Sequence, residues 1–241
     1  MNPLRKLAGQ TAIYGLSSIV GRLLNYLLVP LHTRVFLPEA YGVVTEMYSY
    51  VAFLMIVLTY GFETSFFRFA SNQEDRPRIY ATSLISLLVS SLGFFILCWV
   101  FVGPIADYIQ YPEYPEYIVW FALILATDAA TSIPFAKLRL ENRPLKFAIL
   151  KLVNIGVNVL INVFFLMLCP WLLENGSASI QDAIREIYDP NMGVGYVFIA
   201  NLVASLVTFL LLIPDMWKMS WKFDSELWRR MMRYGFPLLI G

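Results

Sequence analysis

The chain has 241 residues, of which 59% are hydrophobic and only 15% charged, and its mean hydropathy is +0.63. Soluble domains are about 45–50% apolar and about 25% charged, so this composition excludes a single water-soluble domain and a disordered chain. The formal net charge of +1 argues against a nucleic-acid-binding protein, which usually carries a strong basic excess. The composition therefore indicates a polytopic membrane protein.

Six apolar stretches are long enough to cross a membrane, because a bilayer core of about 30 Å requires about 20 helical residues. In chain order, the predicted spans are Gln10–Phe36, Tyr41–Phe62, Ile79–Val102, Tyr117–Ala136, Phe147–Leu172 and Val194–Trp217. A seventh stretch opens at Tyr234 and stops at Gly241. We predict an all-α transmembrane bundle (1–217), a cytoplasmic interfacial amphipathic segment (218–233) and the start of a truncated seventh span (234–241).

The loops between these spans alternate in charge. One set of loops, with the N-terminal tail, holds most of the cations: Arg5, Lys6, Arg68, Arg76, Arg78, Lys137, Arg139, Arg143, Lys146, Lys151, Lys218, Lys222, Arg229, Arg230 and Arg233. The opposite loops are acidic: Glu39, Asp107, Glu113, Glu116, Glu174, Asp182, Glu186 and Asp189. By the positive-inside rule, the N-terminus is expected in the cytoplasm. The longest outer loop, Leu173–Gly193, is expected to carry a short helix over Ile180–Ile187 with Ser177 or Ser179 as its cap.

A polar stripe runs along the first predicted span. At 100° per residue, one narrow face combines Thr11, Gly15, Ser18, Arg22, Asn25, Val29 and His32. Ionisable side chains are costly in a bilayer and usually face a cavity or a partner. A guanidinium at Arg22 either binds a phosphate or carboxylate of a ligand or forms a structural ion pair with Glu46 or Asp128. Arg22, Asn25 and His32 are therefore candidate substrate-binding residues.

Three asparagines, Asn154, Asn158 and Asn162, follow each other at intervals of four residues in the fifth span. They share one side of a helix, with Lys151 one turn away. Asparagines on such a stripe either hydrogen-bond sugar hydroxyls in a wet cavity or hold helices together. They are the second group of candidate substrate-binding residues, and both interpretations stay open.

Acidic residues also lie inside the spans. Glu46 and Asp128 are candidates for ion coupling or for a charge pair with an arginine, because an intramembrane acid can bind a proton or Na⁺ or balance a cation. Glu63 lies near the inner end of its span, where a local pair with Arg68 is expected.

No motif in the chain predicts catalysis. There is no Gly-rich phosphate loop, nucleophile elbow or Cys/His cluster, so we expect no enzyme activity, catalytic residue, metal or cofactor. The cysteines, Cys98 and Cys169, lie in apolar runs and are expected to pack as small hydrophobic residues.

Four segments resemble polysaccharide-exporting flippases of the multidrug/oligosaccharidyl-lipid/polysaccharide exporter superfamily. They are Leu37–Gly42 (LPEAYG), Tyr60–Arg68 (YGFETSFFR), the loop Lys137–Phe147 (KLRLENRPLKF) that precedes the asparagine-rich span, and Tyr234–Leu238 (YGFPL). Their order and spacing extend the similarity over most of the chain.

This resemblance implies a transporter of about 12 to 14 spans in two bundles, with a central cavity that alternates between cytoplasmic and periplasmic access. It implies a lipid-linked (undecaprenyl-diphosphate) oligosaccharide as the cargo, moved across the cytoplasmic membrane of a bacterium during cell-surface polysaccharide biosynthesis. Cationic residues of the cavity hold the anionic head group in such flippases, and Arg22 falls where the related lipid II flippases place an arginine.

The resemblance also implies partners. These are membrane lipid, a polysaccharide polymerase or glycosyltransferases as pathway neighbours, and either a missing C-terminal half or a second copy of the chain. Because the sequence ends inside a hydrophobic stretch, we expect a fragment of a longer protein. Two other functions stay open: a cation-coupled multidrug exporter of the same superfamily, favoured by Glu46 and Asp128, and a membrane-bound glycan polymerase or ligase, disfavoured by the single arginine in Leu173–Gly193.

Overall fold

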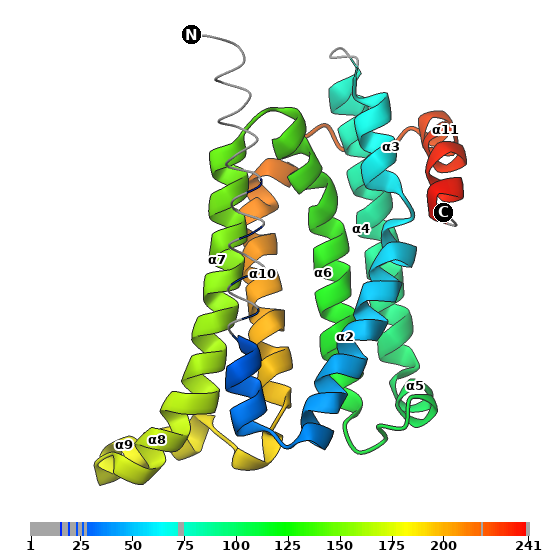
Figure 1. Cartoon of the computed structure of the whole chain (residues 1–241). Coiled ribbons are helices and arrows are strands. Elements are labelled where there is room, and N and C mark those ends of the chain that lie inside the picture. The colour runs from blue at the N-terminus through cyan, green and yellow to red at the C-terminus, as the bar shows by residue number, and fades with distance from the viewer. Residues whose placement is uncertain are drawn as a thin grey trace.

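The computed structural model describes residues 28–71, 75–217 and 219–239, together with residues 15, 19, 23 and 26. Within this part, the regular elements are all helical (Figure 1). They are α2 (Pro38–Thr59), α3 (Phe62–Phe69), α4 (Arg76–Val100), α5 (Val102–Tyr108), α6 (Pro115–Leu140), α7 (Pro144–Val163), η1 (Phe164–Leu168), α8 (Cys169–Asn175), α9 (Ala178–Ile187), η2 (Pro190–Met192), α10 (Gly195–Trp217), α11 (Ser225–Gly235) and η3 (Phe236–Leu239).

Several of these helices begin at a proline. A proline occupies one of the first two positions of α2, α4, α6 and α7. The first turn of a helix has no intrahelical acceptor for its N–H groups, and proline has no N–H, so these prolines start helices without losing a hydrogen bond. The sequence thus sets where these helices begin.

Five stretches of the described chain are long and apolar enough to cross a membrane. They are Pro38–Phe69, Arg76–Val100, Pro115–Leu140, Pro144–Asn175 and Gly195–Trp217. These stretches match the second to sixth predicted spans, and the all-helical class is confirmed over the described residues. Of the first predicted span, residues 28–35 form a helix, and most of the rest lies outside the described residues.

The loops that the charge pattern assigned to one side do lie together. The α3–α4 turn, the α6–α7 turn and the segment from α10 to α11 share one end of the bundle, at the top of Figure 1, which we call the basic end. The α4–α6 connection with α5, and the hairpin of α8 and α9, lie at the opposite, acidic end (Figure 1). The predicted helix in Leu173–Gly193 is confirmed as α9, and Ser177 occupies its N-cap position without a side-chain cap hydrogen bond.

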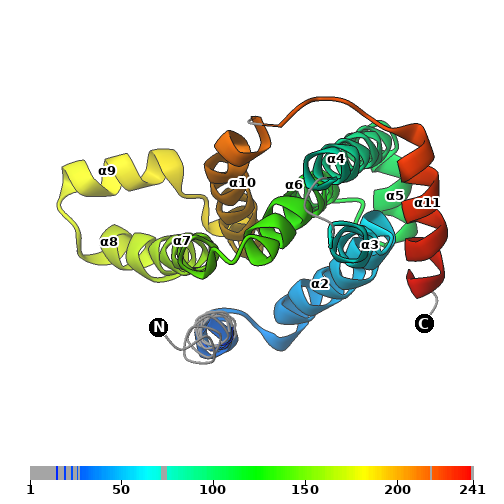
Figure 2. The same cartoon turned by 90° about the horizontal axis from the view of Figure 1, so that it is seen from above.

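Helix α6 is the centre of the bundle. Of the residues in its most apolar 18-residue stretch, 72% are buried, against 17% for Pro38–Phe69. It lies between α4 and α10, with α2 beside it (Figure 2). Its buried positions include many small residues, namely Ala122, Ala126, Thr127, Ala129, Ala130, Thr131 and Ala136. Small side chains allow helix backbones to approach closely, which explains how one helix packs against neighbours on several sides.

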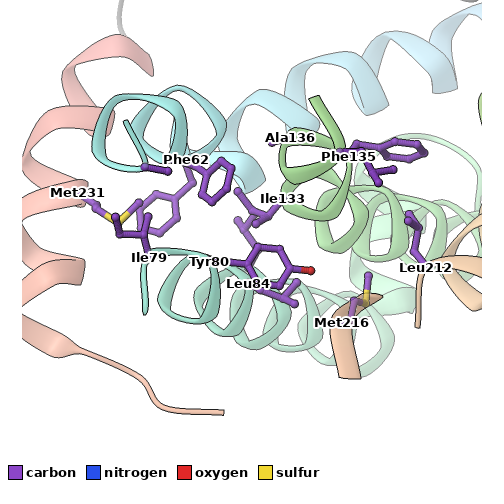
Figure 3. Close-up of a cluster of buried hydrophobic side chains, with 14 of the residues drawn as sticks. Phe62, Ile79, Tyr80, Leu84, Ile133, Phe135, Ala136, Leu212, Met216 and Met231 are labelled. Atoms are coloured by element: carbon purple, nitrogen blue, oxygen red, sulfur yellow. The ribbon is translucent and has the colours of Figure 1, made fainter. Parts of the chain in front are cut away.

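Two large hydrophobic clusters and a small one around Leu58 and Leu125 hold the described part of the bundle together. The cluster at the basic end joins α3, α4, α6, α10 and α11, with Phe62, Tyr80, Leu84, Ile133 and Met231 among its members (Figure 3). The cluster at the acidic end combines aliphatic residues with the aromatic residues Tyr117, Phe121, Tyr196 and Phe198. Each cluster contains residues from distant parts of the chain, so the helices are joined at both ends of the bundle.

The stretch Pro38–Phe69 is interrupted between α2 and α3. Tyr60 and Gly61 both have positive φ, 35° and 71°, which ends α2 and starts α3 in a new direction. A Cβ atom on Gly61 would lie 2.5 Å from the carbonyl oxygen of Gly235. Glycine is therefore required at position 61 for its backbone conformation and for the close approach of α11.

Helix α11 crosses the boundary that we placed at residue 234. It continues through Tyr234 to Gly235, and η3 begins at Phe236. Leu227 and Met231 are buried against the bundle, while the arginines of α11 are exposed. The segment is thus an amphipathic helix docked on the bundle, and the division of the chain into three parts stays a prediction.

We expect Gly61→Ala to lower stability by about 1–3 kcal/mol, because the new Cβ would be strained at positive φ and would meet backbone atoms of Gly235. Thermal unfolding of the purified protein in detergent measures the effect. Gly156→Ala in α7 is the matched control, because open space surrounds that glycine. Equal unfolding temperatures for the two variants would contradict the argument.

Candidate functional site: a charged cavity within the bundle

A cavity of about 360 Å³ opens among α2, α3, α6, α7 and α10. Polar and charged side chains make up most of its lining. The lining residues are Met55, Glu63, Asp128, Thr131, Ser132, Phe135, Arg139, Phe147, Lys151, Asn154, Asn201, Ser205 and Thr208. A polar cavity inside a transmembrane bundle is the usual place for a ligand or ion pathway.

An ion pair connects two walls of this cavity. Arg139, in the last turn of α6, pairs with Glu63 in the first turn of α3. The guanidinium also lies over the ring of Phe67, at 5.1 Å from its centroid. The Arg139 Nε group is buried and has no hydrogen-bond partner among the described residues. The expected pair between Glu63 and Arg68 is therefore wrong, because α3 turns Glu63 toward α6 instead.

A second cation and a second acid face the same space. Lys151 of α7 interacts electrostatically with Asp128, Arg139 and Glu63, and its Nζ lies 4.4 Å from the ring centroid of Phe135. In the described part of the chain, no carboxylate lies within ion-pair distance of Lys151. Two acids and two cations thus balance each other formally, and only one pair is in direct contact.

Amides and hydroxyls complete the lining. Asn154 Nδ2 donates a hydrogen bond to Thr208 Oγ1 over 3.0 Å, and Asn201 Nδ2 donates to the Tyr48 hydroxyl over 2.9 Å. Ser205 is one of the groups that interact with the carboxyl of Asp128. An amide oxygen can accept from a ligand after its nitrogen has found a partner, so this wall presents acceptors for hydroxyl groups.

Residues 7–241 match the family described as "Polysaccharide biosynthesis protein". The chain belongs to this family. No curated protein and no solved structure matches the chain in the corresponding comparisons. As a member of the family, with five membrane-crossing stretches in its described part, this polysaccharide biosynthesis protein is a multi-pass membrane protein.

The three asparagines of the stripe divide between two environments. In this family member, only Asn154 lines the cavity. Asn162, at the other end of the asparagine stripe, is fully buried. There His32 Nε2 donates a hydrogen bond to Asn162 Oδ1 over 3.0 Å. Asn162 Nδ2 in turn donates to the backbone and side-chain oxygens of Asn158, over 2.9 and 2.8 Å. Asn162 lies eight residues after Asn154, which is about 80° beyond two full helical turns, so the stripe faces different neighbours along its length.

His32, Asn158 and Asn162 therefore form one hydrogen-bond network, in which His32 and Asn162 are buried. The network joins the helix at residues 28–35 to α7. Its side chains form hydrogen bonds with one another and do not line the cavity. Of the remaining candidates in the first span, Arg22 and Asn25 lie outside the described residues.

Glu46 lies away from the cavity, on an exposed side of α2. Its carboxylate accepts hydrogen bonds from the hydroxyls of Tyr50 and Tyr111, each over 2.7 Å. Burial raises the pKa of Tyr111 to about 12, and the bond to Glu46 acts in the same direction. Tyr111 thus stays a hydrogen-bond donor at neutral pH. Glu46 has no ion-pair partner among the described residues, so its coupling role stays a prediction.

Arg139 and Lys151 were counted among the cations of the cytoplasmic side and were not predicted as site residues. Arg139 lies in the part of α6 that extends beyond the predicted span to Leu140, whereas Lys151 lies one turn inside the predicted fifth span. Lys151 could have been found from its spacing, because it precedes Asn154 by one helical turn. No comparable signal indicated Arg139 or the α10 residues of the cavity.

We expect Asn162→Ala to destabilise the protein by about 1–3 kcal/mol, because it leaves the buried ring nitrogen of His32 without its partner. Asn154→Ala is the matched control in the same helix. It leaves Thr208 bonded to the carbonyl oxygen of Ala204, so the loss should be much smaller. Thermal unfolding in detergent compares the two, and a greater loss in Asn154→Ala would be the contrary result.

Proposed function

We propose that this polysaccharide biosynthesis protein is a flippase, or part of one, that moves a lipid-linked oligosaccharide across the cytoplasmic membrane of a bacterium. The cargo is an undecaprenyl-diphosphate glycan, and the basic end of the bundle, with the N-terminus, faces the cytoplasm. The protein acts by alternating access and catalyses no covalent step. A second bundle, supplied by a second copy or by the rest of a longer chain, completes the transport path.

The observation that carries the proposal is the state of the two cations in the cavity. Lys151 has no carboxylate in direct contact within the described residues, and the Arg139 side chain stays 35% exposed beside its pair with Glu63. Both cations are thus available to a diphosphate, which binds guanidinium and ammonium groups through charge-assisted hydrogen bonds. The amide wall at Asn154 and Asn201 is suited to the hydroxyl groups of a sugar.

Charge balance gives a physical reason for release as well as binding. An anionic head group that reaches Arg139 competes with Glu63 for the guanidinium, and after departure Glu63 restores the pair. Arg139 is therefore not left without a counter-ion when the cavity is empty, a state that would be costly in the membrane. The polyprenyl chain stays in the hydrocarbon while the head group crosses about 30 Å.

We expect Lys151→Gln to reduce export of the surface polysaccharide about tenfold or more, because one charge-assisted contact contributes about 1.5–3 kcal/mol. The measurement is complementation of a deletion strain, with the amount of protein in the membrane determined through a tag. Lys146→Gln is the matched control on the same helix, since Lys146 pairs with Asp215 outside the cavity. Full export by Lys151→Gln at normal protein level would overturn the proposal.

The two carboxylates of the cavity favour a second candidate, a cation-coupled exporter of cationic drugs. Glu63 and Asp128 would then hold the substrate, and the cations would be dispensable. Asp128→Asn separates the two functions, because an anionic cargo keeps its contacts with Lys151 whereas a cationic cargo loses its acid. In the same complementation measurement, we expect the Asp128→Asn variant to export more surface polysaccharide than the Lys151→Gln variant. The reverse order would favour the drug exporter.

A further inference from the structure

Two cavities adjoin at the basic end, where α11 crosses α3 and α4 (Figure 2). The first, of about 560 Å³, is lined by Arg78, Lys222, Asp224 and neighbouring residues and is called the headgroup cavity below. The second, of about 430 Å³, is lined mainly by Ile85, Val89, Phe223, Trp228 and Met232 and is called the chain cavity. Phe223 lines both of them.

The two cavities follow one side of α4. Arg78, Ile85 and Val89 are separated by seven and four residues, so they lie on the same face of the helix. At 1.5 Å per residue, Val89 lies about 16 Å deeper in the bundle than Arg78. A molecule that fills both cavities must therefore have a polar group near the end of the helix and a long apolar part along it.

The headgroup cavity has cationic groups to offer. Arg78 pairs with Asp224, whose other carboxylate oxygen accepts a hydrogen bond from the backbone N–H of Leu227 over 2.9 Å. A guanidinium has five N–H donors, so the pair leaves several of them free. Lys222 is exposed and has no carboxylate partner in the described part of the chain. With one acid against two cations, the cavity favours an anion.

The polar side chains that line the chain cavity are hydrogen-bonded within the protein. The hydroxyls of Tyr60 and Ser86 are hydrogen-bonded to each other at 2.6 Å, and Trp228 Nε1 donates to Ser86 Oγ over 2.8 Å. Ser90 donates to the carbonyl oxygen of Leu87. With these groups satisfied inside the protein, the surface that remains is aliphatic and aromatic, which is suited to hydrocarbon.

We propose that these cavities bind one anionic phospholipid of the leaflet at the basic end, with its phosphate at Arg78 and Lys222 and an acyl chain between α4 and α11. Exposed Trp217 and Trp221 beside the headgroup cavity place this region at the membrane–water interface, where aromatic side chains gather. The lipid joins α11 to the bundle and is bound independently of the transported cargo. Basic pockets between membrane helices commonly bind such head groups.

Native mass spectrometry of the detergent-purified protein tests the proposal. Equal amounts of dioleoyl phosphatidylglycerol and dioleoyl phosphatidylcholine are added, and we expect one phosphatidylglycerol to be retained in preference. Lys222→Gln should weaken its binding about fivefold, the effect of one surface cation. Arg230→Gln is the matched control, because this exposed cation of α11 lines neither cavity, and it should change binding less than Lys222→Gln.

A second pair of variants tests the chain cavity. Val89→Trp fills it from an exposed position, so folding should be preserved, and lipid retention should fall. Leu92→Trp is exposed on the same helix outside the cavity and should retain the lipid. Equal retention of the two lipids, equal effects of Lys222→Gln and Arg230→Gln, or unchanged binding in Val89→Trp would overturn the proposal. Displacement of the lipid by excess inorganic phosphate would also overturn it and indicate a soluble anion instead.

Discussion

The close packing of α6 against its neighbours is the constraint on which the rest of the structure depends. Hydrophobic burial gives little drive for association within lipid, so membrane helices are held by packing and by polar contacts between them. The small residues of α6 let α4 and α10 approach on either side, and α2 lies on a third. The same helix carries Asp128 and Arg139, so one acid and one cation of the cavity are held on the most buried of the membrane-crossing stretches.

The polar residues of the bundle are divided between two tasks. His32, Asn158 and Asn162 hydrogen-bond one another, with His32 and Asn162 buried, and hold helices together. The cavity instead keeps groups whose bonding is incomplete, as Lys151 and the Nε of Arg139 show. Residue type does not separate the tasks, since asparagines serve both. What separates them is whether each polar atom has found a partner within the protein.

The sequence alone predicted the features that depend on local physics. Apolar length located the five spans of the described chain, the alternation of charge assigned the loops to their two ends, and spacing predicted α9. The pair of Glu63 with Arg139 spans 76 positions and that of His32 with Asn162 spans 130, so neither follows from helical periodicity. The predicted pair of Glu63 with Arg68 was wrong because the actual partner of Glu63, Arg139, lies far away in the sequence.

The interruption at Tyr60 and Gly61 determines how α3 packs against the rest of the bundle. It makes α3 a separate, short helix whose one side meets α6 and whose other side meets α11. Glu63 holds Arg139 on the cavity side, while Ser65 Oγ donates to the carbonyl oxygen of Met231 over 3.0 Å on the other.

A helix of eight residues moves as a unit, so a displacement of α3 that separates Glu63 from Arg139 also moves Ser65 relative to α11. The contact of Gly61 with Gly235 lies at the start of the same helix and opposes large sliding there. Any separation of Glu63 from Arg139 by a movement of α3 would therefore also change the contacts between α3 and α11, which involve the Ser65 hydroxyl and the backbone at Gly61 and Gly235.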